Sequence, residues 1–356
     1  MNKPPHIPVM LDEVLTRLRP ANGEHYIDAT FGAGGYTRAI LQSAECEVVG
    51  LDRDPAAEPT AAEVGAKFSP RFHFIGTPFS QLTRALEIHP DGFDGVVFDL
   101  GVSSMQLDTA ARGFSFQADG PLDMRMSARE NAAALSNDPD DHDQPSAATI
   151  VNTASLMELR DIIFQLGEEK RARRIAEAII EQRKVQPITR TLQLAKLVED
   201  TVGRRSNEPK HPATRTFQAL RLHVNDELGE LVRSLSATEQ CLRPGGRLVV
   251  VTFHSLEDRI VKRFLAERSG RSKSVSRHLP TTADLEPHQL QGKSNTFSFE
   301  LVNQRPLTSS QGEITANPRS RSARLRSAAR TAATAWPLTS TDLGLPAITK
   351  RGLLHR

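Results

Sequence analysis

The fold is decided by the stretch His25-Tyr26-Ile27-Asp28-Ala29-Thr30-Phe31-Gly32-Ala33-Gly34-Gly35, in which a short apolar run leads into a glycine-rich turn. An apolar run bounded by turn residues is typical of a buried strand. Glycines let the backbone of the turn approach a ligand closely, and a helix that follows them presents free amide groups to that ligand. A tight structural turn would give the same pattern.

Further apolar runs predict that this strand belongs to a parallel sheet. Helical patterns precede or separate the first four runs, and alternation of helices with strands indicates a Rossmann-like α/β fold with both faces of the sheet covered. The run at 296–302 alternates and predicts an antiparallel edge strand that pairs with 322–328. The other predicted strands are residues 47–52, 72–75, 95–100 and 246–253.

The fourth and fifth predicted strands are separated by residues 101–245, far more than a simple crossover needs. Apolar residues recur at helical spacing over 156–166 and 175–182, which predicts an inserted helical domain. A single long helix over about 213–242 should lead back to the sheet. We therefore expect a discontinuous core of residues 1–106 and 213–330, an inserted substrate-recognition domain over 107–212, and a flexible tail over 331–356.

Composition limits the class of protein. The chain has 356 residues, of which 38% are hydrophobic and 25% charged, so it can bury a sizeable core. No apolar run approaches the ~20 residues that cross a bilayer. The only cysteines, Cys46 and Cys241, lie far apart, which excludes a disulfide scaffold or a cysteine zinc site and favours a cytoplasmic location.

Charge is distributed unevenly along the chain. Residues 1–158 carry a net charge of −12 and residues 159–356 a net charge of +14, although the whole chain carries +2. A basic half favours an anionic partner. Solvated helix faces would explain the same asymmetry.

Acidic residues at the ends of three predicted strands indicate the kind of cofactor. The nicotinamide fingerprint GxGxxG fails, because its third glycine position is Thr37. Asp52 ends the second strand and can accept hydrogen bonds from the two hydroxyls of a ribose. Asp28 and Asp99 place two more carboxylates at the same sheet edge. S-adenosylmethionine, which has a ribose and an amino group but no pyrophosphate, fits these features, whereas solvated loop acids remain the alternative.

Nine motifs along residues 6–323 together resemble the MraW/RsmH family of methyltransferases. Their order and spacing are specific in combination, and the resemblance covers about residues 6 to 330. The motifs lie at residues 6–14, 28–35, 51–55, 98–108, 112–116, 119–126, 211–221, 253–259 and 317–323.

The resemblance implies a class I methyltransferase sheet that uses S-adenosylmethionine, and an activity that methylates N4 of a cytidine in the decoding region of 16S ribosomal RNA. The implied partners are that RNA and the small ribosomal subunit, with no membrane, and a homodimer is left open. This chain departs from the family at Tyr36, where histidine is usual. In the implied pocket, the turn at the methionine end is formed by Gly34, Gly35 and Tyr36. Asp52 holds the ribose and Phe79 flanks adenine. Asp99 and Gln106 complete the site.

The acceptor that positions the cytosine amino group is not fixed by the sequence. The sulfonium is already a strong electrophile, so no metal is expected in the reaction. Candidates are the carbonyls of residues 100–102 and the side chains of Ser103, Asp123 and His254. Each has a structural alternative: Ser103 as a helix cap, Asp123 as an ion-pair partner of Arg125, and His254 as a satisfied structural histidine.

Basic residues of the second half are candidates for phosphate contacts. They are Arg171, Arg173, Arg174, Lys210, Arg215, Arg221, Arg319 and Arg321. Salt bridges along helices would explain some of them. Competing functions are methylation of DNA or another RNA, a nicotinamide-dependent dehydrogenase, and a catalytically silent ribosome-assembly factor.

Overall fold

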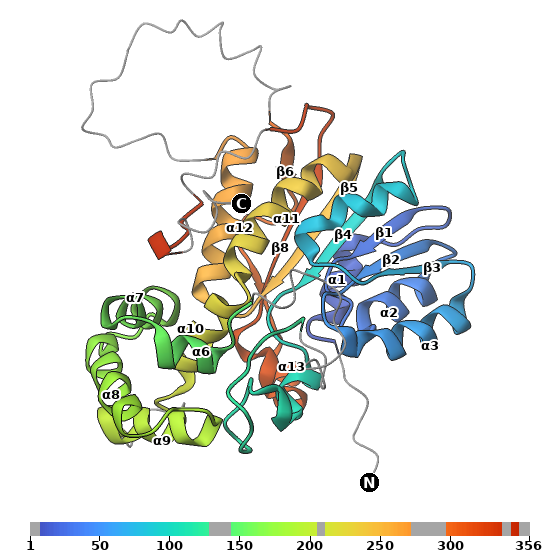
Figure 1. Ribbon diagram of the computed structural model, residues 1–356. Coiled ribbons are helices and arrows are strands. Elements are labelled where there is room, and N and C mark those ends of the chain that lie inside the picture. The colour runs from blue at the N-terminus through green and yellow to red at the C-terminus, as the bar shows by residue number, and fades with distance from the viewer. Residues whose placement is uncertain (1–7, 128–143, 205–210, 272–296, 337–342, 349–356) are drawn as a thin grey trace, which may run out of the picture. The chain divides into compact units, whose positions relative to one another are not determined.

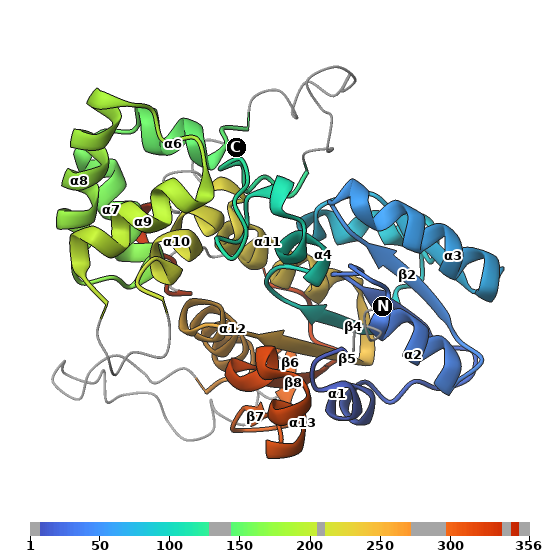
Figure 2. The same ribbon diagram turned by 90° about the horizontal axis from the view of Figure 1, so that it is seen from below.

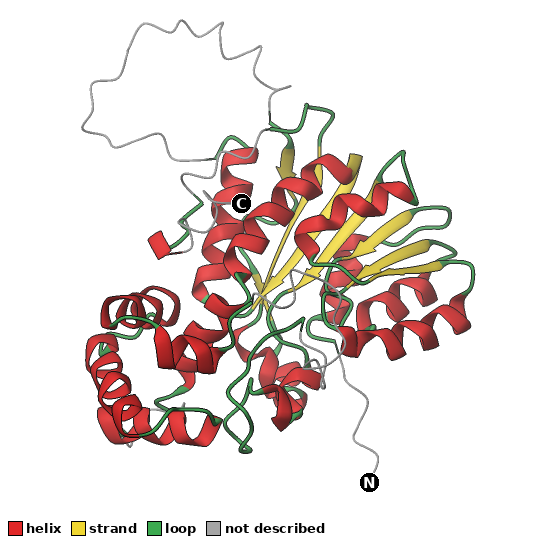
Figure 3. Cartoon of the chain, viewed as in Figure 1, coloured by secondary structure: helices red, strands yellow, loops and turns green. Residues whose placement is uncertain are grey.

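The predicted strands pair into one mixed sheet, drawn in yellow in Figure 3. The computed structural model describes residues 8–127, 144–204, 211–271, 297–336 and 343–348 (Figure 1). The strand order is β3-β2-β1-β4-β5-β8-β6, and β7 also pairs with β8. The strands are β1 (His25–Asp28), β2 (Glu47–Leu51), β3 (Phe72–Ile75), β4 (Phe93–Asp99), β5 (Leu242–Thr252), β6 (Phe299–Leu301), β7 (Leu307–Thr308) and β8 (Arg324–Arg330).

The direction of the strands confirms the α/β prediction. Neighbours from β3 through to β5 run parallel. The two late segments add antiparallel strands, since β8 pairs with both β5 and β6. Because all parallel strands end at one edge, residues that follow them gather there.

The described chain divides into two compact units. The first comprises 1–52, 57–101 and 230–344, and the second comprises 53–56, 102–229 and 345–356. The predicted boundaries at 106/107 and 212/213 stay a prediction. Within the described residues, no helix combines the length and the apolar character needed to cross a membrane.

In the first unit, one face of the sheet packs against α1 (Leu11–Leu18), α2 (Gly35–Ser43) and α3 (Glu58–Phe68). Alternate strand residues point to this face. They form a core with apolar residues of the three helices: Val48, Val97, Val249, Val251 and Leu325 from the strands, and Val14, Leu18, Ile40, Leu41 and Val64 from the helices. Phe264 of α12 (Ser255–Arg268) packs edge-on against Phe299 of β6, with ring centroids 5.8 Å apart.

The second unit is mainly helical, and Figure 2 shows its green helices side by side. The apolar positions predicted over 156–166 form the buried face of α7, except Leu156, which is exposed. The first turn of α7 is closed by a capping box between Ser155 and Glu158. The helices are α4 (Ser104–Asp108), α6 (Ala147–Thr153), α7 (Leu156–Gly167), α8 (Ala172–Val185), α9 (Thr191–Val202) and α10 (Thr214–Val224).

The prediction of one long helix over 213–242 is wrong. The structure has α10 (Thr214–Val224) and then α11 (Glu227–Cys241). Asp226 has φ 46°, in the left-handed region, and the Asn225 amide bonds the Arg221 carbonyl, 3.0 Å away. A polar side chain that bonds nearby backbone competes with the helix, so the helix breaks there.

Described residues of the predicted tail make specific contacts. Trp336 donates its backbone N–H to Glu239 Oε1 over 3.0 Å. Its ring lies 4.8 Å from the guanidinium carbon of Arg268. Arg268 in turn donates to Glu239 Oε2 over 3.0 Å, and both side chains are almost fully buried. Residues past the last strand therefore cover a buried ion pair of the first unit.

Candidate active site

The glycine turn connects β1 to α2 in the first unit. Gly32 and Gly34 have φ of 51° and 70°, a region that favours glycine. A Cβ on Gly34 would come within 2.9 Å of the Phe31 ring, and one on Gly35 within 2.4 Å of Pro8 Cγ. The turn therefore requires glycine at these positions. Its Gly32 N–H donates to Asp52 Oδ2 over 2.7 Å, which links the turn to the acid at the end of β2.

Two of the three predicted acids lie at the carboxyl ends of β1 and β4. Asp28 is buried, and Asp99 is half-buried. Asp28 accepts from the hydroxyl of Thr37 over 2.7 Å and from Thr30 N over 3.3 Å. Burial raises the pKa of Asp28 to about 6. Thr37, the residue that breaks the nicotinamide fingerprint, thus stabilises the Asp28 carboxylate.

Asp99 is the acid whose side chain has an oxygen without a hydrogen bond from the described residues. Its backbone N–H donates to Thr30 Oγ1 over 2.6 Å, but its buried Oδ1 accepts no hydrogen bond from the described residues. Burial, with smaller repulsion from Asp28 and Glu257, raises the pKa of Asp99 to about 8. A buried carboxyl without a partner is costly. A cation or N–H donor beside it would satisfy it.

Tyr36 lies in the first turn of α2. Its ring is buried, and its hydroxyl donates to the Val9 carbonyl. Burial, followed by repulsion from Asp99 and Asp28, raises the pKa of Tyr36 well above its usual value, so the hydroxyl stays a donor. Next to it, Met10 N donates to Glu313 Oε1 over 2.6 Å. The chain before α1 is therefore tied to Tyr36 at the start of α2 and to Glu313 of α13 (Gln311–Ala316).

Phe79 and His254 also lie in the first unit. Phe79 starts a 3₁₀ segment (Phe79–Glu87) and meets Phe98 edge-on, with centroids 6.0 Å apart. His254 caps α12: its Nδ1 accepts from Glu257 N over 3.4 Å, and its Nε2 lies 3.1 Å from Glu257 Oε1. The cap fits a structural role for His254, but its buried Nε2 forms no hydrogen bond with the described residues. The histidine is therefore not fully satisfied, and its catalytic role stays a prediction.

Ser103 and Gln106 lie in the second unit and cap α4 together. Ser103 Oγ accepts from Gln106 N over 3.2 Å, while Gln106 Oε1 accepts from Ser103 N over 2.9 Å. The amide of Gln106 donates to Asp54 Oδ2 over 2.7 Å. Arg112, which opens the family motif at 112–116 but is not among the predicted site residues, donates to Asp54 Oδ1 over 3.0 Å.

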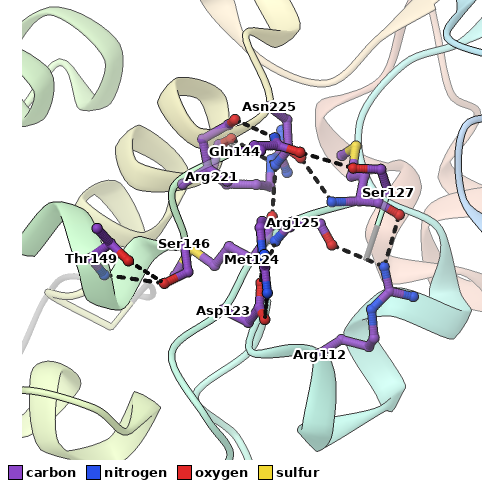
Figure 4. A network of polar contacts seen from close by, with 12 residues as sticks. Arg112, Asp123, Met124, Arg125, Ser127, Gln144, Ser146, Thr149, Arg221 and Asn225 are labelled. Atoms are coloured by element: carbon purple, nitrogen blue, oxygen red, sulfur yellow. Dashed lines mark hydrogen bonds and ion pairs between the residues drawn. The ribbon is translucent and has the colours of Figure 1, made fainter. Parts of the chain in front are cut away.

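Asp123 lies in a loop of the second unit that a polar network holds in shape (Figure 4). Its carboxylate forms a two-point ion pair with Arg125, with distances of 2.8 and 2.9 Å. Met124 between them is fully buried with φ 66°, a strained conformation for a non-glycine residue.

Asn225 compensates for this strain. Its side-chain amide donates to Met124 O over 2.7 Å and accepts from Met126 N over 2.8 Å. Arg112 also donates to the carbonyls of Arg125 and Met126, each over 3.0 Å. Asn225 lies outside the nine family motifs, and the helical pattern predicted over 213–242 gives no sign of its role.

The predicted RNA-binding residues fall into two groups. Arg173, Arg174, Arg319 and Arg321 are exposed. Three others hold parts of the second unit: Arg171 donates to Val202 O over 2.8 Å, Arg215 to Glu168 O over 3.2 Å, and Arg221 forms a two-point pair with Glu227. Lys210 lies outside the described residues.

Comparison with known proteins gives a consistent picture. A model of the MraW methylase family matches residues 3–331. A protein of Parvibaculum lavamentivorans named ribosomal RNA small subunit methyltransferase H is 49% identical over 97% of this chain and 95% of its own length. A protein of the same name from Rhizorhabdus wittichii is 51% identical over 93% of this chain and 95% of its own. The solved structure of an rRNA methylase from Streptococcus thermophilus covers 90% of this chain and 93% of its own at 9% identity, with a TM-score of 0.36, which is too low to support an argument.

Proposed function

Since this chain belongs to the MraW methylase family and is therefore an S-adenosylmethionine-dependent methyltransferase, we propose that it methylates N4 of a cytidine in the decoding region of 16S ribosomal RNA. The relatives' name, which specifies ribosomal RNA of the small subunit, supports the class of substrate. The choice of N4 and of the decoding region rests on the family resemblance of the sequence motifs. With such a substrate, the enzyme would act in the cytoplasm and the small ribosomal subunit would be its partner.

The single observation that carries the cofactor assignment is the buried Asp99 Oδ1 that lacks a hydrogen-bond partner. The amino group of S-adenosylmethionine, as an ammonium, would satisfy it and favour the ionised carboxylate. Asp52 would accept from the ribose, the turn of Gly34, Gly35 and Tyr36 would face the methionine end, and Phe79 would flank adenine. Gln106 is proposed as a further contact by the motif match alone.

The cofactor supplies a methyl group on a sulfonium, and the chain must supply position. The lone pair of cytosine N4 is delocalised into the ring, so acceptors for its N–H groups are needed to localise it. The target base must leave its stack to reach the pocket. Carbonyls of residues 100–102, Ser103, Asp123 and His254 are the proposed acceptors.

Mass spectrometry of 16S ribosomal RNA tests this function. RNA from a bacterial strain that lacks this gene should lose one methyl group on a decoding-region cytidine, and the purified chain should restore it on isolated small subunits. An Asp52→Ala variant should restore nothing, because it loses the ribose contact. If the deletion strain keeps a fully methylated cytidine, the substrate assignment is wrong.

A further inference from the structure

Three histidines and one glutamate gather at the opposite end of the sheet from the acids of the candidate site. His25 and Glu47 are the first residues of β1 and β2 and are paired in the parallel ladder. His73 lies near the start of β3, and His89 precedes β4. All four belong to the first unit.

The donor atoms of this His–Glu cluster are spaced for coordination rather than for hydrogen bonding. His89 Nε2 lies 3.3 Å from Glu47 Oε2, His73 Nε2 lies 3.9 Å from the same oxygen, and His25 Nε2 lies 4.0 Å from Glu47 Oε1. One donor atom each of His25, Glu47 and His89 lies within 4.8 Å of the other two. Ligands about 2.0–2.2 Å from a tetrahedral zinc ion stand roughly 3.3–3.6 Å apart, so side-chain rotations would close the set around an ion.

Within this cluster, His89 is the residue with a buried ring nitrogen that lacks a hydrogen bond from the described residues. Its side chain is 12% exposed, and its buried Nε2 forms no hydrogen bond with the described residues. Its ring stacks on His25 at 3.8 Å and meets Phe93 edge-on at 5.4 Å. To bind one ion together, the rings of His25 and His89 have to rotate out of this stack until their Nε2 lone pairs converge.

We propose that His25, Glu47 and His89 bind one divalent transition-metal ion of the zinc type, with His73 or water as the fourth ligand. Imidazole nitrogens with one carboxylate are a donor set suited to zinc. The ion would tie the starts of β1 and β2 to the segment before β4, so its role is structural. This site is independent of the proposed methylation.

Arg243 lies beside His25 and should weaken metal binding there, which offers a way to test the proposed site. Its Nη2 lies 3.4 Å from His25 Nδ1, while Nη1 and Nε donate to Asp94 and to the Asp91 carbonyl. A metal on Nε2 leaves the His25 proton on Nδ1, where it would face this guanidinium. The neutral variant Arg243→Gln offers an acceptor there and should bind the metal more tightly.

Calorimetry with Zn²⁺ on the tag-free full chain tests the proposal. We expect one saturable ion per chain, binding weakened at least about 10- to 100-fold in Glu47→Gln and His89→Asn, the range that even outer partners of a metal cost, and tighter binding in Arg243→Gln. The matched control is His211→Asn, whose histidine pairs with Glu199, at 3.5 Å, in the second unit and is not part of the His–Glu cluster; it should bind as the parent does.

Co²⁺ added to the unmutated chain gives a second readout that does not depend on how the variants fold. We expect the visible absorption bands of four-coordinate Co²⁺ at one equivalent. No saturable binding, no such bands, or equal Zn²⁺ affinity in the parent and in Glu47→Gln would overturn the site. Retained S-adenosylmethionine binding by each variant confirms that it is folded.

Discussion

Asp54 in the second unit is a buried aspartate, and Asp99 at the carboxyl edge of the sheet has a buried carboxyl oxygen, but the surroundings of the two residues differ. Asp54 is ion-paired to Arg112 and bonded by Gln106. Asp99 has a buried oxygen without a hydrogen bond among the described residues. The difference separates scaffold from site: a satisfied carboxylate stabilises the fold, while an unsatisfied one is prepared for a ligand.

The largest effect should come from breaking the satisfied pair. Arg112→Met leaves Asp54 buried with its ion-pair partner removed, and also frees two backbone carbonyls, so the free energy of unfolding should fall by about 3–5 kcal/mol. Urea denaturation measures it. Arg173→Met on the exposed face of α8 is the matched control, expected within about 0.5 kcal/mol of the parent. Equal losses in the two variants would refute the scaffold role of Arg112.

Asp99→Asn should weaken cofactor binding without lowering stability, whereas Arg112→Met should lower stability. S-adenosylmethionine binding should weaken roughly 10- to 100-fold, since a charge-assisted hydrogen bond is lost. Stability without ligand should not fall, because the raised pKa means that the parent loses stability as pH rises from about 4 to about 8. Calorimetry and thermal denaturation at pH 8 give the two values. Loss of stability without loss of binding would make Asp99 a scaffold residue.

The same carboxyl predicts a pH dependence of cofactor binding. An ammonium beside Asp99 lowers its pKa, so binding releases a proton below about pH 8. Affinity should therefore rise by up to about tenfold per pH unit toward pH 8. It should level off or fall above that, where an α-amino group loses its own proton. In Asp99→Asn the rise should be absent, and a rise that persists would assign the proton to another group.

The smallest effect should come from exposed charge. Reversing Arg173 and Arg174 to glutamate should weaken binding of the small subunit mainly at low salt, and each lost phosphate contact should lower the salt slope by roughly 0.7–0.9. Stability and cofactor affinity should stay unchanged. Lys67→Glu, on exposed α3 of the first unit, is the control. Binding curves that coincide with the parent's would exclude this face of α8 from RNA contact.

Much of the first unit could be predicted from sequence, because its strands are short apolar runs and its turn needs glycine. Antiparallel pairing of the late strands followed from alternation. The break at Asn225 could not, since that residue bonds Met124, about a hundred positions earlier in the chain. Local periodicity carries no trace of such a contact.

The candidate site could likewise be predicted only in part from the sequence. Residue type and strand position were enough to select Asp28, Asp52 and Asp99, but not to tell which of them lacks a partner. That depends on Thr30 and Thr37, whose hydroxyls satisfy neighbouring groups only once the turn is folded. The His–Glu cluster was likewise invisible, because its four residues are spread over three strands and a loop.

Trp336 lies beyond residue 331, where the family match ends. A protein shortened at that limit would keep every motif of the family yet lose the indole that shields Arg268 and Glu239 from solvent. The limit set by likeness to relatives is therefore not the limit of this folding unit, and any trimmed version intended for crystallisation or assay should retain the segment through Trp336.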